Sequence, residues 1–136
     1  EGLQRNNWAD VQIVAVETEG AESFAASVRE GHLVELASIS SIATSLGARQ
    51  VCNQAYIRSK TYPIKNVVVS DRSAVAACEQ FIEDHQVVVE PACGASLATV
   101  YDNVPELSSF SLVLVIICGG VTVTVAQLQQ WSKSFV

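Results

Sequence analysis

Three residues with reactive side chains, Glu17, Glu90 and Cys118, each directly follow a run of apolar residues. If those runs are parallel strands, the three side chains lie at strand carboxyl ends, where open α/β sheets bind their ligands. A carboxylate there can bind a hard cation, and a thiol can form a weak hydrogen bond. The pair Gly119 and Gly120 follows at once and would let a ring or a phosphate approach the backbone closely.

Each of these residues also has a structural explanation. Glu17 could be a solvated carboxylate at the end of a strand, and Glu90 could favour the start of the helix that Pro91 opens. Cys118 could be a small core residue, and the glycine pair could form a tight turn. The residue types alone leave these alternatives open.

The elements that position these residues alternate along the chain. The run at 112–117 is apolar on both faces, which predicts a central strand of a parallel sheet. Further strands are predicted at 10–16, 66–70 and 87–90, with a short candidate at 49–53. Helices are predicted at 21–30, 39–46, from 54 to about 60, 72–85, 91–99 and 127–135, with Ser38 and Asp71 as caps of the second and fourth.

This alternation predicts an α/β fold, with an open, mostly parallel sheet and flanking helices. At 136 residues the chain fits a single domain, 1–136. Charged residues make up only 16%, below the usual quarter, which indicates a surface that faces another domain or subunit. The net charge of −6 and the scattered cations argue against a nucleic-acid partner.

The sequence predicts no membrane partner and a cytoplasmic protein. No apolar run reaches the roughly 18 residues that a membrane helix needs, and no signal-peptide pattern opens the chain. The four cysteines form neither a CxxC pair nor a zinc-like cluster with histidine. Buried, reduced thiols are favoured over two disulfides.

Four stretches together resemble one family. They are residues 15–21 (AVETEGA), 41–47 (SIATSLG), 89–95 (VEPACGA) and 115–120 (VIICGG). Their content and order are similar to the serine dehydratase and serine dehydratase-like group, which are fold-type II pyridoxal-phosphate enzymes. The resemblance runs over essentially the whole chain, and the third and fourth stretches are specific as a pair.

The resemblance implies an L-serine/L-threonine ammonia-lyase, a lyase of amino-acid catabolism. Such an enzyme eliminates the β-hydroxyl of its substrate and releases a 2-keto acid and ammonia, with pyridoxal phosphate as the electron sink. It also implies that Cys118 lies beside the pyridine nitrogen of the cofactor and that Gly119 and Gly120 belong to the cofactor site. The stretch after them, Val121–Thr124, differs from the polar residues usual in the family.

The resemblance further implies a site for a monovalent cation, most simply potassium. Its ligands would be the Glu17 carboxylate and the backbone carbonyls of Ala21, Leu46 and Ala48. One carboxylate and several loop carbonyls form the kind of oxygen-rich set that a hard cation requires.

Two parts of the family's site are not found in this sequence. The lysine that binds the cofactor and the glycine-rich phosphate loop are expected before Glu1, so the chain is expected to be a fragment. Lys60, Lys65 and Lys133 lie in other contexts, so no residue of this chain is assigned a catalytic role. The expected partner is the missing N-terminal segment or a second chain, and the exposed surface favours a homo-oligomer.

Two functions therefore remain open at the sequence level. The chain could be part of a serine/threonine dehydratase that is not catalytic alone. It could instead be a stand-alone, non-enzymatic binding or signalling protein, for example an immunomodulatory one, that reuses this fold.

Overall fold

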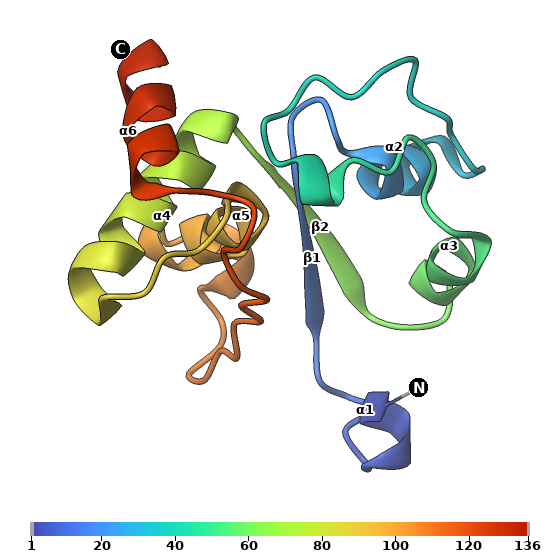
Figure 1. The fold of residues 1–136 in the computed structure, drawn as a ribbon. Coiled ribbons are helices and arrows are strands. Elements are labelled where there is room, and N and C mark those ends of the chain that lie inside the picture. The colour runs from blue at the N-terminus through green and yellow to red at the C-terminus, as the bar shows by residue number, and fades with distance from the viewer. Residues whose placement is uncertain (1, 136) are drawn as a thin grey trace.

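The computed structural model describes residues 2–135 and has a two-stranded parallel sheet at its centre (Figure 1). Strand β1 (Ile13–Thr18) pairs with β2 (Ile64–Val69) in a register that runs from Ile13 opposite Ile64 to Thr18 opposite Val69. Both strands are rich in β-branched residues, which suit a pleated and partly buried surface. The α/β fold class predicted from the sequence is confirmed.

Helices lie on both sides of this sheet. Helices α2 (Ser23–Glu30) and α3 (Asn53–Ser59) lie on one side, and α4 (Asp71–His85), α5 (Pro91–Tyr101) and α6 (Val125–Ser134) lie on the other (Figure 1). Three short elements complete the fold: helix α1 (Gly2–Arg5) and the 3₁₀ turns η1 (Thr44–Leu46) and η2 (Pro105–Leu107). None of the helices within residues 2–135 is long and apolar enough to cross a bilayer.

The core lies where α4, α5 and α6 meet. Helix α5 lies close against α4 because Gly94 has no side chain at the contact: a Cβ atom there would lie 2.1 Å from the carbonyl oxygen of Ala74. Leu128 of α6 and Val75 of α4 are among the largest fully buried side chains of this cluster. The small residues predicted for α5 therefore allow the two helices to approach closely.

Several helix ends follow from local chemistry. The hydroxyl of Thr124 and the amide side chain of Gln127 form a capping box at the start of α6. Helix α2 ends at Gly31, whose φ of 73° is left-handed, as the sequence predicts. The predicted cap of α4 is wrong by one residue: Ser70 accepts from the Ser73 amide at 3.1 Å, and Asp71 is already helical.

The predicted helix at 39–46 is wrong, and only η1 forms within it. The backbone here bonds to distant parts of the chain instead of to its own preceding turn. The Ser40 amide donates to the Gly20 carbonyl at 3.2 Å, and the Ile42 amide donates to the Asp71 carboxylate at 3.0 Å. Serine side chains favour such alternatives to a helix.

Three predicted strands are also wrong, because none of them pairs with a neighbour in the structure. The stretches 49–53, 87–90 and 112–117 contain no ladder residues, and β1 and β2 are the two strands found within residues 2–135. A strand is defined by hydrogen bonds to an adjacent strand as well as by its own residues. The predicted central strand 112–117 is thus an apolar segment without strand neighbours.

Candidate functional site

The loop formed by Cys118, Gly119 and Gly120 is fastened to the first turn of α5 by the thiol of Cys93. The amides of Cys118 and Gly119 donate to the Cys93 sulfur at 3.2 Å and 3.4 Å, and the thiol donates to the Gly119 carbonyl at 3.3 Å. The Glu90 amide donates to the same carbonyl at 3.0 Å. Four hydrogen bonds therefore fix the backbone on one side of this loop.

Gly120 completes the attachment by close backbone contact. A Cβ atom at this position would lie 2.3 Å from the Val88 carbonyl oxygen and 2.9 Å from the Val89 Cα, so only glycine fits. Two residues further on, the Thr122 hydroxyl donates to the Glu90 carboxylate. Glu90, which directly precedes α5, thus lies at the base of the loop.

The other side of the loop is open. Cys118 is exposed, and a Cβ atom built on Gly119 would meet no heavy atom within 4 Å. Gly119 also has a φ of 144°, which L residues rarely adopt. The loop can therefore receive a flat group against its outer side without moving its anchored side. The prediction that Cys118 ends a strand is wrong, since 112–117 has no ladder.

The thiols differ enough in burial to give a chemical test. Cys52 and Cys118 are exposed, whereas Cys78 and Cys93 are buried, and burial raises the pKa of Cys78 to about 12. Because the thiolate is the nucleophile, we expect iodoacetamide to label Cys52 and Cys118 in the native chain. Cys78 and Cys93 should be labelled only after unfolding. Peptide mass spectrometry of a time course checks this, and early labelling of Cys93 would contradict the loop geometry.

Glu17 lies at a different place, at the end of β1. Its two carboxylate oxygens accept the backbone amides of Phe24 at 2.9 Å and Ala25 at 2.8 Å, so the side chain caps the start of α2. Burial raises the pKa of Glu17, and the two backbone hydrogen bonds act in the opposite direction. The Glu17 carboxylate is thus partly buried and hydrogen-bonded, and it is not the solvated carboxylate of the structural explanation.

The other predicted cation ligands lie on two neighbouring segments. Ala21 is buried in the turn between β1 and α2, while Leu46 and Ala48 lie at the end of η1. The Leu46 carbonyl accepts the Ala48 amide at 2.8 Å. The two segments meet where the Ser40 amide donates to the Gly20 carbonyl. Convergence of all four oxygens on one ion stays a prediction.

A polar network around Asp71 was missed by the sequence analysis. The Ser41 hydroxyl donates to the Asp71 carboxylate at 2.6 Å and lies 2.7 Å from the Thr18 hydroxyl. The same carboxylate accepts the Ile42 amide. Thr18 and Ser41 are buried, so this network joins the end of β1, the loop before η1 and the start of α4. The sequence signal for it was Asp71 after the predicted strand 66–70, which alone predicts only a helix cap.

Replacing Asp71 with asparagine should therefore destabilise the chain. The Asp71 carboxylate accepts hydrogen bonds from the Ser41 hydroxyl and the Ile42 amide. The NH₂ group of an asparagine would face one of these two donors and could not accept its hydrogen bond. We expect a loss of roughly 1.5–3 kcal/mol in the free energy of unfolding, the range for hydrogen bonds to charged groups. Urea unfolding measures it, with the exposed Asp102→Asn as the matched control. Equal stability of the two variants would contradict the network.

The sequence matches a known family and its characterised members. Residues 1–119 match the family described as "Pyridoxal-phosphate dependent enzyme". The chain is 45% identical to L-serine dehydratase/L-threonine deaminase of Bos taurus over 98% of its own length and 43% of that protein. It is 42% identical to the serine dehydratase-like protein of Rattus norvegicus over 95% of its length and 42% of that protein. The chain thus spans less than half the length of these relatives.

A solved structure has the same fold. An L-serine ammonia-lyase from Rhizomucor miehei superposes with a TM-score of 0.93 at 35% identity, covering 99% of this chain and 44% of that enzyme. Essentially the whole chain therefore has the fold of one part of a larger enzyme.

Proposed function

The chain belongs to the family of pyridoxal-phosphate dependent enzymes, and from this premise we propose that it forms the Cys118 side of the cofactor site of an L-serine/L-threonine dehydratase. The observation that carries the proposal is the loop fixed by Cys93, whose outer side is open. Cys118 and Gly119 of the loop also lie within the family match, which covers residues 1–119.

The residues of the loop fit a flat aromatic cofactor. Gly119 leaves space on the outer side, and Gly120 lets the loop lie directly against the backbone of Val88 and Val89. Pyridoxal phosphate, when bound, would withdraw electrons from the substrate and so ease loss of the α-proton and of the β-hydroxyl. The exposed Cys118 thiol would hydrogen-bond to the ring nitrogen, as a neutral and weak partner.

Two of the chain's three lysines lie over aromatic rings. The Nζ of Lys60 lies 4.3 Å from the centre of the Tyr56 ring, and that of Lys65 lies 5.9 Å from the centre of the Phe110 ring. Lys133 is in the last turn of α6. In this proposal the cofactor lysine and the phosphate loop belong to the part of the enzyme that this chain does not span. The chain alone is then not catalytic.

Reconstitution tests this proposal. The chain is mixed with pyridoxal phosphate and L-serine, with and without a second polypeptide that comprises the remaining, N-terminal part of the bovine enzyme. We expect visible absorbance of bound cofactor and formation of keto acid only when both polypeptides are present. Turnover by the chain alone would overturn the assignment of the lysine to the missing part.

Two variants locate the site. Cys118→Ala should lower kcat of the reconstituted enzyme by about tenfold or more, a loss of roughly 1.4 kcal/mol in transition-state stabilisation. Cys52→Ala, at the other exposed cysteine, should leave kcat unchanged. Equal activity of the two variants would place the ring nitrogen elsewhere. A folded pair that binds no cofactor would favour the alternative, a non-enzymatic protein.

We further propose that Glu17 and the carbonyls of Ala21, Leu46 and Ala48 bind a monovalent cation. A cation beside Glu17 would offset the cost of burying its charge, which is the main reason its pKa is raised. We expect the midpoint of thermal unfolding to be higher in potassium chloride than in tetramethylammonium chloride at equal ionic strength, since a ligand of the native state stabilises it. The exposed Glu19→Gln should keep this difference and Glu17→Gln should lose it. Equal midpoints in the two salts would contradict the site.

The proposed location is the cytoplasm. All four cysteines are free in the structure, and two of them are buried in the core. Proteins of oxidising compartments more often pair their cysteines.

A further inference from the structure

The connection between α2 and α3, residues 31–52, is long and has little regular structure. The 3₁₀ turn η1 is the regular element described within it. A long connection of this kind is usually either functional or disordered. Hydrogen bonds from distant residues fix the part around η1, which favours a functional role for it.

This connection lies directly against the turn between β1 and α2. The Ser40 amide donates to the Gly20 carbonyl at 3.2 Å. A Cβ atom on Gly20 would lie 2.1 Å from the Ser40 hydroxyl oxygen and 3.3 Å from the Ser41 amide nitrogen, so a side chain there would push the two segments apart. The two segments that carry the predicted cation ligands are therefore in direct contact.

Asp71, at the start of α4, holds the next residues of the connection. Its carboxylate accepts the Ser41 hydroxyl at 2.6 Å and the Ile42 amide at 3.0 Å. Because the one hydroxyl hydrogen of Ser41 is used in this bond, the Thr18 hydroxyl at 2.7 Å and the Ala43 amide at 3.0 Å donate to the Ser41 oxygen. Asp71 thus orients the hydroxyl that joins the connection to the end of β1.

Hydrogen bonds lead from this network into both ligand segments. On one side, the Thr18 carbonyl accepts the Ala21 amide at 2.9 Å, and Thr18 directly follows Glu17. On the other side, the Ala43 carbonyl accepts the Leu46 amide at 2.9 Å. The residues whose oxygens are predicted to bind one ion are therefore connected through the same buried hydroxyl groups.

We propose that Asp71 is a positioning residue for the monovalent cation. Its carboxylate sets how closely residues 46–48 lie to the end of β1, and so whether the carbonyls there can bind the same ion as Glu17. This inference rests on the proposed cation site. A hard cation needs several oxygens together, and loss of a group that orients metal ligands lowers metal affinity by roughly ten- to a hundredfold.

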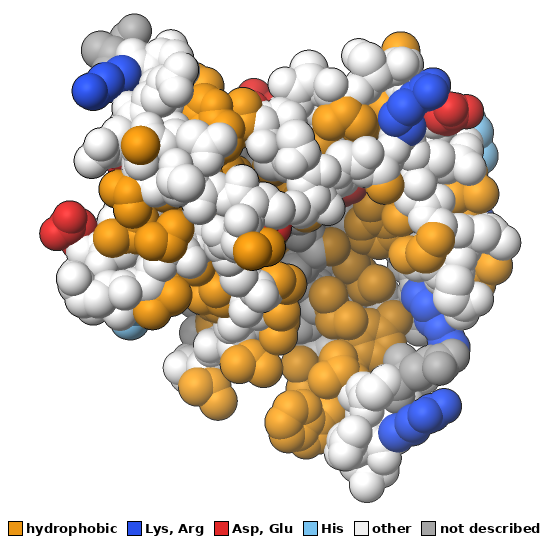
Figure 2. Space-filling view, viewed as in Figure 1, with side chains coloured by type: hydrophobic (Ala, Val, Ile, Leu, Met, Phe, Trp, Pro, Cys, Tyr) orange, Lys and Arg blue, Asp and Glu red, His pale blue; other side chains and the backbone are white. Residues whose placement is uncertain are grey.

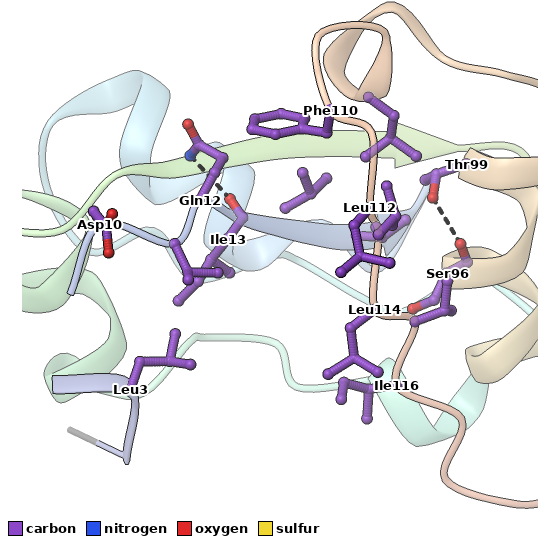
Figure 3. Close-up of a pocket in the computed structure, with 16 residues that line it drawn as sticks. Leu3, Asp10, Gln12, Ile13, Ser96, Thr99, Phe110, Leu112, Leu114 and Ile116 are labelled. Atoms are coloured by element: carbon purple, nitrogen blue, oxygen red, sulfur yellow. Dashed lines mark hydrogen bonds between the residues drawn. The ribbon is translucent and has the colours of Figure 1, made fainter. Parts of the chain in front are cut away.

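An apolar groove beside β1 is poorly suited to the ion. It has a volume of about 530 Å³ and lies between β1 and residues 112–117 (Figure 2). Of the described residues that line it, Asp10 alone is charged, and it lies at the opposite end from Ser96 and Thr99 (Figure 3). A cation there would lose hydration against a mainly apolar wall, which is costly. Asp10 therefore provides a control carboxylate.

The dependence of stability on potassium tests the inference. The free energy of unfolding in urea is measured at several potassium chloride concentrations, with tetramethylammonium chloride keeping the ionic strength constant. A ligand of the native state raises this free energy by RT ln(1 + c/Kd), where c is the potassium concentration, so the fit separates Kd from the stability without potassium. We expect Asp71→Asn to raise Kd by about tenfold or more.

Three further variants separate positioning from general destabilisation. Leu128→Ala shortens a fully buried side chain of the helical core and should lower stability without changing Kd. Asp10→Asn, at the groove, should also leave Kd unchanged. Ser41→Ala removes the hydroxyl that links Asp71 to Thr18 and should raise Kd as Asp71→Asn does. It serves in its place if Asp71→Asn does not fold.

The results that would overturn the inference are distinct from one another. If potassium does not stabilise the wild-type chain, the proposed cation site is refuted and the role of Asp71 with it. If potassium stabilises the wild type and Asp71→Asn with the same Kd, the cation site stands and Asp71 only supports the fold. An equal rise of Kd in Leu128→Ala would make the effect one of general destabilisation. Loss of the potassium effect in Asp10→Asn would place the ion in the groove.

Discussion

Replacing Gly94 with alanine is expected to lower the free energy of unfolding by about 3 kcal/mol, at the upper end of the range for overpacked cores. The new Cβ atom would lie 2.1 Å from the Ala74 carbonyl oxygen, 2.5 Å from the Cys78 sulfur and 2.9 Å from the Ala74 carbonyl carbon. Two of these three atoms are backbone atoms of α4, so the helices must move apart. Urea unfolding followed by circular dichroism measures the loss.

Gly31→Ala is the matched control for this first prediction. A Cβ atom on Gly31 would meet nothing within 4 Å, but its φ of 73° is left-handed. It should therefore cost roughly 1–2 kcal/mol through backbone conformation alone. If both variants lose the same stability, the close contact between α4 and α5 is not what makes Gly94 necessary.

The second large effect is expected at Gly120, where alanine should detach the loop of residues 118–120 from Val88 and Val89. The three atoms nearest to such a Cβ all belong to the backbone of Val88 and Val89, so a side-chain movement cannot relieve these contacts. We expect a loss of about 1–3 kcal/mol in the free energy of unfolding. We also expect faster labelling of Cys93 by iodoacetamide, because the loop that covers its sulfur would be displaced.

The labelling rate distinguishes loop displacement from general destabilisation. Val121→Ala, at the next residue, changes a side chain that is 99% exposed and should leave both stability and Cys93 labelling unchanged. Gly94→Ala should lower stability, yet Cys93 should remain protected by the loop in the folded fraction. Slow labelling of Cys93 in Gly120→Ala would show that the loop tolerates a side chain there.

The fold was predictable where local signals and partners agree. Helix α4 and strand β2 formed close to their predicted bounds because their apolar patterns match the elements they pack against. The run 112–117 has the strongest strand pattern and forms no strand, because a ladder requires a neighbour and the described chain provides none there. The sequence of a strand determines which of its faces are apolar, but the hydrogen-bond partners of its backbone must come from an adjacent strand.

The contacts that support the candidate site could not be predicted from the sequence. The sequence predicts Glu90 and Cys118 at the carboxyl ends of strands, whereas in the structure the Glu90 amide donates to the Gly119 carbonyl although neither 87–90 nor 112–117 forms a ladder. The role of Cys93 in holding the loop was not visible, because 25 residues separate it from Cys118 and a buried cysteine usually has a packing role. The capping role of Glu17 likewise depends on how α2 turns back over the end of β1.

The exposed segment 112–117 has a consequence for how the chain can be handled. Its six residues are all Leu, Val or Ile, with no charge and no proline, which is the composition of segments that stack into cross-β fibrils. With their side chains uncovered, many copies can pair with one another through the same backbone groups. The chain's solubility therefore depends on whether another surface covers residues 112–117. Fibril growth and any such covering contact compete for the same backbone groups.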